Sequence, residues 1–407
     1  MIFFYNISLK IYYLVVLIVS PFNKKAKQWI SGRKNIFEKI KKSGACETKN
    51  IWFHVSSLGE YEQGLPVIEK IKQKYPSHKI FLTFFSPSGY EIKKNSKTAD
   101  YIFYLPNDSK KNARKFIELI NPQISFFVKY DFWYYYLNYL KKNKIPIYIF
   151  STIFRKKQSF FKWYGAWYRK MLFTFTHIFV QNEESVKLLK SIGIENVTIT
   201  GDTRFDRVID ISENSKNFEI IEKFKDNKFV IVAGSTWQPD EEILINFINN
   251  REDQIKFIIA PHNIKDENIK RISNLLKVSY TLYSKVKIEE IKNCKVLIID
   301  NIGMLSSIYK YGEIAYIGGG FGVSIHNTLE AATYGMPVVF GTNYHKFQEA
   351  KDLIEIKAAF SISNYNELEM TIIKLLNNNE LLSQTSAIAK KYVYANKGST
   401  EKIIGRI

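Results

Sequence analysis

Short apolar runs alternate with amphipathic stretches in the first half of the chain. Between the first two runs, Leu65, Ile68, Ile71 and Tyr75 recur at helical spacing. The runs themselves show no strict alternation of apolar and polar positions, which is typical of strands buried on both faces of a parallel sheet. The predicted strands lie at 51–57, 79–85, 123–130, 146–152, 177–182 and 197–202.

The same pattern restarts after a polar stretch at 210–227. It predicts two doubly wound α/β domains in tandem, 23–209 and 210–407, each with its ligand site at the carboxyl ends of the strands. We expect a last helix near 380–395 to pack back across the first domain. The second set of predicted strands lies at 228–236, 256–262, 295–300, 313–320 and 336–341.

Residues 1–22 are mostly apolar, interrupted by Lys10 and followed by basic residues from Lys24 onward. The span is near the ~20 residues that cross a bilayer, but a lysine in its middle is costly there. A cleavable signal peptide is not indicated, because the positive charge follows the apolar run instead of preceding it. An interfacial anchor and a buried first helix are the alternatives. We favour a membrane anchor with the body of the protein on the cytoplasmic side.

The composition, 46% apolar and 24% charged, excludes a disordered polyelectrolyte. The net charge of +20 lies in the first half, since residues 1–200 hold 33 Lys and Arg against 13 Asp and Glu, and residues 201–407 hold 26 of each. The first half therefore faces an anionic partner: nucleic acid, a membrane surface or an acidic substrate. Cys46 and Cys294 match no metal or redox spacing.

Candidate chemistry in the first half lies where predicted strands end. Glu60 follows the first strand beside Gly59 and is a candidate general base, although a first-turn glutamate can also simply complement a helix dipole. Asp131 ends the third strand, where it can be catalytic or can cap a loop. Ser86 and Gly89 end the second strand and are candidate ligand contacts.

In the second half, a glycine-rich loop at 318–322 precedes a helical pattern that begins near 324–327. Backbone amides in such a turn can bind a phosphate, although a glycine-rich sequence is equally typical of a tight turn with a purely structural role. The loop is neither a P-loop nor a complete GxGxxG. The sequence contains no HExxH, Cys/His cluster, DxD or GxSxG, so neither a metal site nor an acyl-transfer serine is predicted.

These motifs together resemble those of the GT-B glycosyltransferases, with two Rossmann-like domains facing a central cleft. They are closely similar to those of the 3-deoxy-D-manno-octulosonic acid (Kdo) transferases of lipopolysaccharide assembly. The matching segments are HVSSLGE (54–60), LTFFSPSGYE (82–91), GDTRFDRV (201–208), AGSTW (233–237), APH (260–262), GML (303–305), GGGFGVSIHNTLEAATYGMPVVFG (318–341) and NYHKFQEA (343–350).

The resemblance implies an inverting, metal-independent transfer of Kdo from CMP-Kdo to a lipid A precursor, with no cofactor. Glu60 would be the general base and Asp131 a second catalytic carboxylate. The implied acceptor residues are Ser57, Gly59, Ser86, Gly89 and Arg204. The implied donor residues are Ser235, His262, Gly303, Met304, Leu305, Gly320, Gly322, Ser324, His326, Asn327 and Glu330.

The chain departs from the family pattern in three places. Pro261-His262 stands where the family often has Pro-Arg-His, so a donor-binding arginine is missing or replaced. Asp131 is the surviving carboxylate of a segment that often holds two glutamates, and Arg204 replaces a commoner lysine.

The resemblance also implies a location at the cytoplasmic face of the inner membrane, with its anionic surface as a partner. One alternative is another GT-B nucleotide-sugar transferase or an epimerase, which would not need a lipid-facing anchor. Nucleic-acid binding is disfavoured, because the basic residues are dispersed through a doubly wound domain and no nucleic-acid-binding module is present.

Overall fold

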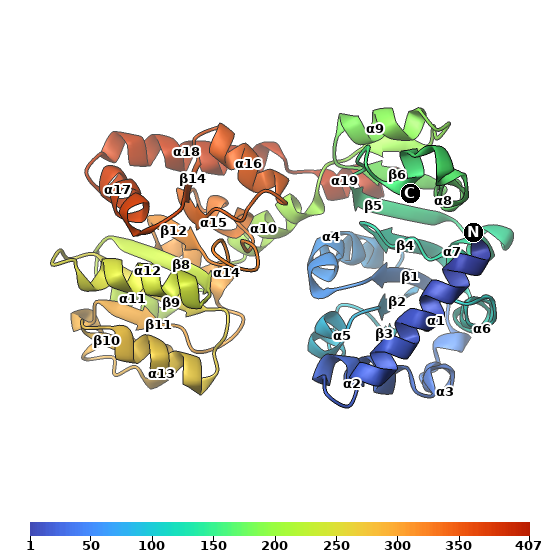
Figure 1. Cartoon of the computed structure of the whole chain (residues 1–407), viewed down its shortest axis with the longest axis horizontal. Helices are drawn as coiled ribbons and strands as arrows, with labels where there is room; N and C mark the ends of the chain where they lie inside the picture. The colour runs from blue at the N-terminus through green and yellow to red at the C-terminus, as the bar shows by residue number, and fades with distance from the viewer. The chain divides into compact units, whose positions relative to one another are not determined.

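The computed structural model describes residues 1–407 and divides into two compact units. Unit 1 comprises Met1–Arg207 and Gly398–Ile407, and unit 2 comprises Val208–Lys397. Helix α10 (Thr203–Glu213) runs across the boundary between them. The C-terminal segment, red in Figure 1, thus returns to the unit that contains the N-terminus.

Unit 1 holds a seven-stranded sheet in the order β3-β2-β1-β4-β5-β6-β7, and every neighbouring pair is parallel. Its elements are α1 (Ile2–Val19), α2 (Lys24–Arg33), α3 (Ile36–Lys42), β1 (Asn50–Val55), α4 (Leu58–Lys74), β2 (Lys79–Phe84), α5 (Pro87–Lys93), β3 (Tyr101–Tyr104), α6 (Lys110–Ile120), β4 (Pro122–Val128), α7 (Tyr134–Lys142), β5 (Ile147–Thr152), α8 (Ala166–Leu172), β6 (His177–Val180), α9 (Glu183–Lys190), β7 (Val197–Ile199) and α19 (Ser399–Ile404).

Unit 2 repeats this architecture with the order β10-β11-β9-β8-β12-β13-β14, again parallel throughout. Its elements are α11 (Glu219–Lys225), β8 (Val230–Thr236), α12 (Gln238–Asn249), β9 (Lys256–Pro261), α13 (Asp266–Leu275), β10 (Tyr280–Leu282), β11 (Val296–Ile298), α14 (Leu305–Ile308), β12 (Ile314–Ile317), α15 (Leu329–Ala332), β13 (Val338–Gly341), α16 (Gln348–Glu355), β14 (Ala359–Ile362), α17 (Tyr365–Leu376) and α18 (Asn379–Ala395).

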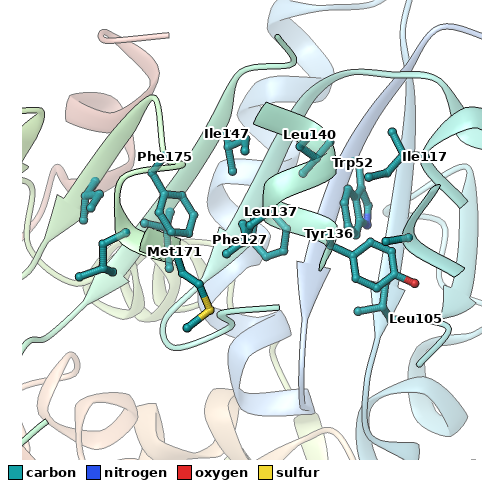
Figure 2. Packing of buried hydrophobic residues seen from close by; sticks show 14 of the residues in the cluster. Trp52, Leu105, Ile117, Phe127, Tyr136, Leu137, Leu140, Ile147, Met171 and Phe175 are labelled. Carbon is teal, nitrogen blue, oxygen red and sulfur yellow. The ribbon is translucent and has the colours of Figure 1, made fainter. Parts of the chain in front are cut away.

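Both faces of the first sheet are covered, which explains the unbroken apolar runs. Every residue of β1 is buried. On one face, Trp52 packs with Phe127 of β4 and Tyr136 of α7, at ring-centroid distances of 5.2 and 5.6 Å, as Figure 2 shows. On the other face, Phe53 stacks on Phe126 at 4.5 Å. The prediction of two doubly wound parallel sheets is therefore confirmed.

Three strands of the structure, β3, β10 and β14, were not predicted from the apolar pattern. Each has only three or four residues and lies at the edge of a sheet. The exposure of Tyr280 at 40% illustrates why an edge strand lacks a continuous apolar run.

The C-terminal helices differ from the expectation. The predicted helix near 380–395 corresponds to α18, which stays in unit 2 and packs on α15 and α17. The short helix α19 is the element that packs on α4 of unit 1, where Ile403 is buried and Glu401 pairs with Lys70 at 3.0 Å. The carboxylate of Asp206 accepts hydrogen bonds from the backbone amides of Gly398 and Thr400 and so fixes the start of this segment.

Helix α1 is long and apolar enough to cross a membrane by length and composition, with a mean hydropathy of 2.0. None of its residues is fully buried. It nevertheless contacts unit 1 along one side: the Tyr5 hydroxyl donates to Asp108 Oδ2 at 2.5 Å, and Tyr135 donates to Asn6 Oδ1 at 2.8 Å. The expectation of an apolar first helix is met, and α1 has a side that faces protein.

Candidate functional site

In unit 1, the β1–α4 and β4–α7 connections bring two carboxylates to one edge of the sheet. Because β1 and β4 are parallel neighbours, their carboxyl ends place Glu60 and Asp131 close enough for the charge of Glu60 to act on Asp131. Ser57 occupies the N-cap position of α4, and its hydroxyl donates to Glu60 Oε2 at 2.8 Å instead of capping a backbone amide. One carboxylate oxygen of the half-buried Glu60 is thereby oriented.

Asp131 has a different environment from Glu60. The residue is 6% exposed, the hydroxyl of Ser56 donates to Oδ1, and Oδ2 is buried with no hydrogen-bond partner. Burial raises the pKa of Asp131 well above its usual range, and the nearby charge of Glu60 raises it further. The pair thus consists of a buried carboxyl that favours its neutral form and a more accessible carboxylate.

His54 lies under this pair and is fully buried. Its Nε2 accepts a hydrogen bond from Trp133 Nε1 at 2.9 Å, so the proton of the neutral ring resides on Nδ1, which donates to Thr83 Oγ1 at 2.9 Å. Burial lowers the pKa of His54 to about 3, and the charge of Arg33 also lowers it. Although Asp131 Oδ2 is 3.8 Å from Nε2, a neutral imidazole forms no ion pair with it.

The remaining acceptor candidates of unit 1 lie at the same sheet edge with structural partners of their own. Ser86 caps α5 by accepting from the Ser88 amide at 3.2 Å. A Cβ on buried Gly89 would lie 2.4 Å from the Phe84 ring, so this glycine is required for packing. A Cβ on Gly59 would meet nothing nearer than 3.9 Å, which leaves open space beside Glu60.

Arg204 follows β7 and binds the buried Asp202, with Nε and Nη2 both near Oδ2 at 2.8 and 2.7 Å. Burial alone would raise the pKa of Asp202, but the charge and hydrogen bonds of Arg204 hold that pKa below its usual range. Gln63 of α4 donates to the same carboxylate at 2.5 Å. The hydrogen bond from Gln63 links Asp202, just before α10, to α4, and Arg204 keeps 24% of its side chain exposed.

In unit 2, three rings from three strand ends form a stack. Trp237 after β8 lies 4.4 Å from His262 after β9, and His262 lies 4.7 Å from His326 after β12. Trp237 Nε1 also donates to His326 Nε2 at 3.0 Å. Burial lowers the pKa of both histidines, that of His326 to about 4, so the stack is uncharged at neutral pH.

Asp240 of α12 fixes the glycine-rich loop after β12 by accepting a hydrogen bond from its backbone. This buried carboxylate accepts from the amides of Gly319 and Trp237, at 2.8 and 2.9 Å, and from the Tyr316 hydroxyl. Burial raises the pKa of Asp240, and these hydrogen bonds act in the opposite direction. Of the stack, His262 and His326 were predicted as donor residues, whereas Trp237 and Asp240 were not predicted as site residues. The only local signal for Trp237 was the AGSTW segment that contains it.

The glycines of this loop have different roles. A Cβ on Gly320 would lie 2.5 Å from the backbone of Gly341, so a side chain is excluded there by close packing of two chain segments. Gly319 has φ +94°, which also favours glycine. Gly322, by contrast, is exposed, and a Cβ there would meet nothing within 4 Å.

The expected helix start near 324–327 is wrong, because helix α15 begins at Leu329 and has four residues. The amides of Ser324 and His326 donate to the carbonyls of Gly319 and Gly318, so these two donors close the loop and are not directed at a ligand. The half-buried Glu330 accepts from Asn327 Nδ2 at 3.1 Å.

The other candidates of unit 2 occupy neighbouring strand ends. Ser235 has φ +54° at the end of β8. Gly303 has φ +92° in open space, Met304 is 9% exposed, and Leu305 begins α14. Throughout residues 1–407, no group of three or more His, Cys, Asp and Glu side chains is placed to hold a metal ion.

Two parallel α/β units with candidate residues at the carboxyl ends of the strands define the GT-B architecture. Solved structures share it. A putative UDP-N-acetylglucosamine 2-epimerase from Listeria monocytogenes has a TM-score of 0.60 at 13% identity, covering 88% of this chain and 95% of that one. MurG from Acinetobacter baumannii has a TM-score of 0.55 at 12% identity, covering 88% and 99%. At these identities the likeness concerns the fold alone.

The sequence comparisons are more specific. Residues 31–207 match the family model of the 3-deoxy-D-manno-octulosonic-acid transferase (Kdo transferase). The Kdo transferase of Aquifex aeolicus is 28% identical over 334 residues, covering 80% of this chain and 86% of that protein. The enzyme of Rickettsia prowazekii is 29% identical, covering 82% and 73%. The chain is thus similar to Kdo transferases over residues 31–207 of the family model and over most of its length in these relatives, in agreement with the resemblance of the motifs.

Proposed function

We propose that this protein transfers Kdo from CMP-Kdo to a hydroxyl of a lipid A precursor (lipid IVA), with inversion at the anomeric carbon and without a metal ion. The observation that carries the proposal is the carboxylate pair of unit 1, in which Glu60 is accessible and Asp131 is buried with an unpartnered oxygen. The curated relatives, which are named Kdo transferases, support the choice of substrates.

In this proposal Glu60 is the general base. Ser57 occupies Oε2, so Oε1 takes the proton of the acceptor hydroxyl while its oxygen bonds to the anomeric carbon. The bond from that carbon to the phosphate oxygen breaks, and CMP leaves with the bonding electrons. Open space beside Gly59 admits the acceptor to the carboxylate.

Asp131 assists this step by staying neutral. A second ionised carboxylate beside Glu60 would oppose the negative charge that the base needs, and burial removes that charge. The unpartnered Oδ2 offers a hydrogen-bonding position to a group of the bound substrate, because a buried polar atom without a partner costs about 1–3 kcal/mol.

The donor nucleotide is proposed to bind in unit 2. The uncharged ring stack of Trp237, His262 and His326 offers an aromatic surface at three strand ends. The open position at Gly322 allows close approach to the backbone, and Glu330 is proposed to contact the ribose. The other proposed donor contacts are Ser235, Gly303, Met304, Leu305, Gly320, Ser324 and Asn327.

The phosphorylated acceptor and the anionic membrane surface are proposed to meet unit 1, because the charge lies there. Unit 1 contains 37 Lys and Arg against 16 Asp and Glu, and unit 2 contains 22 against 23. Ser57, Ser86, Gly89 and Arg204 are the proposed acceptor contacts at the sheet edge. The exposed face of α1 is proposed to anchor the enzyme to the cytoplasmic leaflet of the inner membrane.

The test is transfer of Kdo from CMP-Kdo to lipid IVA in EDTA by the wild type, Glu60→Gln and the control Glu62→Gln. Glu62 lies two residues away and pairs with Lys93 and Arg207, so its variant retains activity if position 60 is specific. Loss of the general base is expected to reduce kcat by about 10²–10⁴-fold. Robust activity of Glu60→Gln would remove this role, and a strict metal requirement would contradict the metal-independent reaction.

A further inference from the structure

Helix α1 presents one side to unit 1 and leaves the opposite side apolar and exposed. Its half-buried residues, Tyr5, Asn6, Leu9 and Val16, recur at helical spacing, and the first two form hydrogen bonds to the body of unit 1. The exposed side chains include Phe3, Phe4, Ile7, Ile11, Leu14 and Ile18. A helix that is bound along one side to a folded domain can place only its opposite, apolar side against a membrane surface. A helix that crosses a bilayer would instead be surrounded by lipid.

A second exposed aromatic site lies at residues 155–173, which we name the tryptophan loop. Trp163 is 91% exposed and Tyr164 is 48% exposed, with their ring centroids 5.6 Å apart. Adjacent exposed aromatic rings of this kind form an apolar patch that can mark a contact with a protein or a membrane. The other five tryptophans of the chain are buried or half-buried, so Trp163 is an exception that calls for an explanation.

The backbone of the tryptophan loop is held firmly, so the exposure of Trp163 is part of its fold. Arg169 donates to the carbonyls of Phe160 and Lys162, at 3.0 and 2.9 Å, on both sides of the preceding turn. A Cβ on Gly165 would lie 2.1 Å from the Ser159 carbonyl oxygen, which shows how tightly the turn is closed. The two exposed rings are therefore presented in a defined position.

The charge of the tryptophan loop indicates an anionic partner. Residues 155–173 contain six Lys and Arg and no Asp or Glu, and Lys156, Lys157 and Lys170 are exposed. Exposed aromatic rings flanked by lysines match the head-group region of a bilayer with anionic lipid, where Trp and Tyr concentrate and lysines meet phosphate.

The tryptophan loop is also continuous with α1. Trp167, four residues after Trp163, lies 5.4 Å from the ring of Tyr5 and 5.0 Å from that of Tyr134. Figure 1 places α8 next to the N-terminal end of α1. The exposed Phe3 and Phe4 thus flank the residue through which α1 contacts the loop.

We propose that the tryptophan loop is a second membrane-contact element, which inserts Trp163 and Tyr164 into the head-group region of an anionic phospholipid bilayer. Helix α1 then lies along the membrane surface and does not cross it. This inference rests on the membrane-surface location proposed above, and its tests measure lipid contact independently of sugar transfer.

The first test measures binding of the full chain to vesicles of phosphatidylethanolamine and phosphatidylglycerol. The Trp163→Ala/Tyr164→Ala variant is expected to bind on the order of tenfold more weakly. The Lys156→Gln/Lys157→Gln variant is expected to lose about 30-fold in affinity, and this loss disappears with phosphatidylcholine alone. Met370→Ala, exposed at 63% in unit 2, and Lys390→Gln/Lys391→Gln, also exposed, are the matched controls. Equal binding of all variants would overturn the proposal.

The second test uses tryptophan fluorescence with brominated phosphatidylglycerol. Quenching is expected in the wild type and is expected to fall at least about twofold in Trp163→Phe, because the other tryptophans are less exposed. Quenching that is unchanged by Trp163→Phe would contradict insertion of the loop. Activity on detergent-dispersed lipid IVA serves as a separate readout: a loop variant that binds vesicles weakly but transfers Kdo in detergent supports the inference. Inactivity of the wild type in detergent would count against the proposed function and not against membrane contact.

Discussion

His54 provides a prediction whose size follows from its burial. Its pKa is lowered from the usual 6.5 to about 3 in the folded protein, since burial disfavours the charged ring and Arg33 adds repulsion. In the unfolded chain, His54 therefore becomes protonated near pH 6.5, whereas in the native state it becomes protonated only near pH 3. Stability from this group is fully present above 6.5 and is lost as the pH falls towards 3.

Because of this pKa shift, His54 lowers the free energy of unfolding by about 5 kcal/mol when the pH falls from above 6.5 to below 3. The loss is about 3 kcal/mol two pH units below 6.5. His54→Gln keeps a donor and an acceptor but cannot titrate, so it lacks this acid sensitivity. The stability difference between wild type and variant is expected to shrink by about 3 kcal/mol between pH 7 and pH 4.5. Burial raises the pKa of Asp131, which has the opposite effect on the pH dependence of stability, but Asp131 is present in both proteins.

Urea unfolding followed by tryptophan fluorescence measures this difference. Five of the six tryptophans belong to unit 1, and only Trp237 belongs to unit 2, so the signal reports mainly on the unit that contains His54. A wild-type-to-variant difference that stays constant between pH 7 and pH 4.5 would refute the claim that His54 is buried and neutral.

Three further predictions concern the packing inside each unit. Gly89→Ala is expected to lower the free energy of unfolding of unit 1 by about 1–3 kcal/mol in urea, because its Cβ meets Phe84, whereas Gly59→Ala is expected to leave stability unchanged and to lower only transfer activity. Asp240→Ala is expected to destabilise unit 2 by about 2–4 kcal/mol in circular-dichroism melts and to weaken CMP binding in calorimetry, since the glycine-rich loop loses its acceptor. Removal of 398–407 is expected to cost unit 1 about 3–5 kcal/mol in fluorescence-detected urea unfolding, by exposing the surface that Ile403 covers.

The two parallel sheets were predictable because a strand covered on both faces leaves an unbroken apolar run, as in β1 and β8. The position of Glu60 at a strand end was predictable for the same reason, since a strand followed by a helix places the connection at the carboxyl edge. Short edge strands such as β3 and β14 were not predicted, because they are partly exposed and have only four residues.

Contacts between distant segments could not be predicted. Trp133 donates to His54 across 79 residues of sequence, and Asp240 accepts from the Gly319 amide across the same separation. No local period marks either pair. The helix predicted to begin near Ser324 is absent there for a related reason. The Ser324 amide donates to the carbonyl of Gly319 and closes a loop, and this contact leaves no periodic pattern in the sequence.

In the proposed mechanism, the neutral state of His54 decides which carboxylate of the pair is the better candidate for the base. A protonated imidazole 3.8 Å from Asp131 would stabilise the ionised form of that carboxyl and put two negative charges beside one another. Because Trp133 donates to Nε2 and burial excludes the second proton, His54 gives Asp131 no such support. Burial therefore favours the neutral form of Asp131, and the proposed base is the half-buried Glu60, which solvent and substrate can reach. If His54 were found charged at neutral pH, the division of roles between Glu60 and Asp131 would lose its physical basis, so the acid-stability measurement also tests the proposed chemistry.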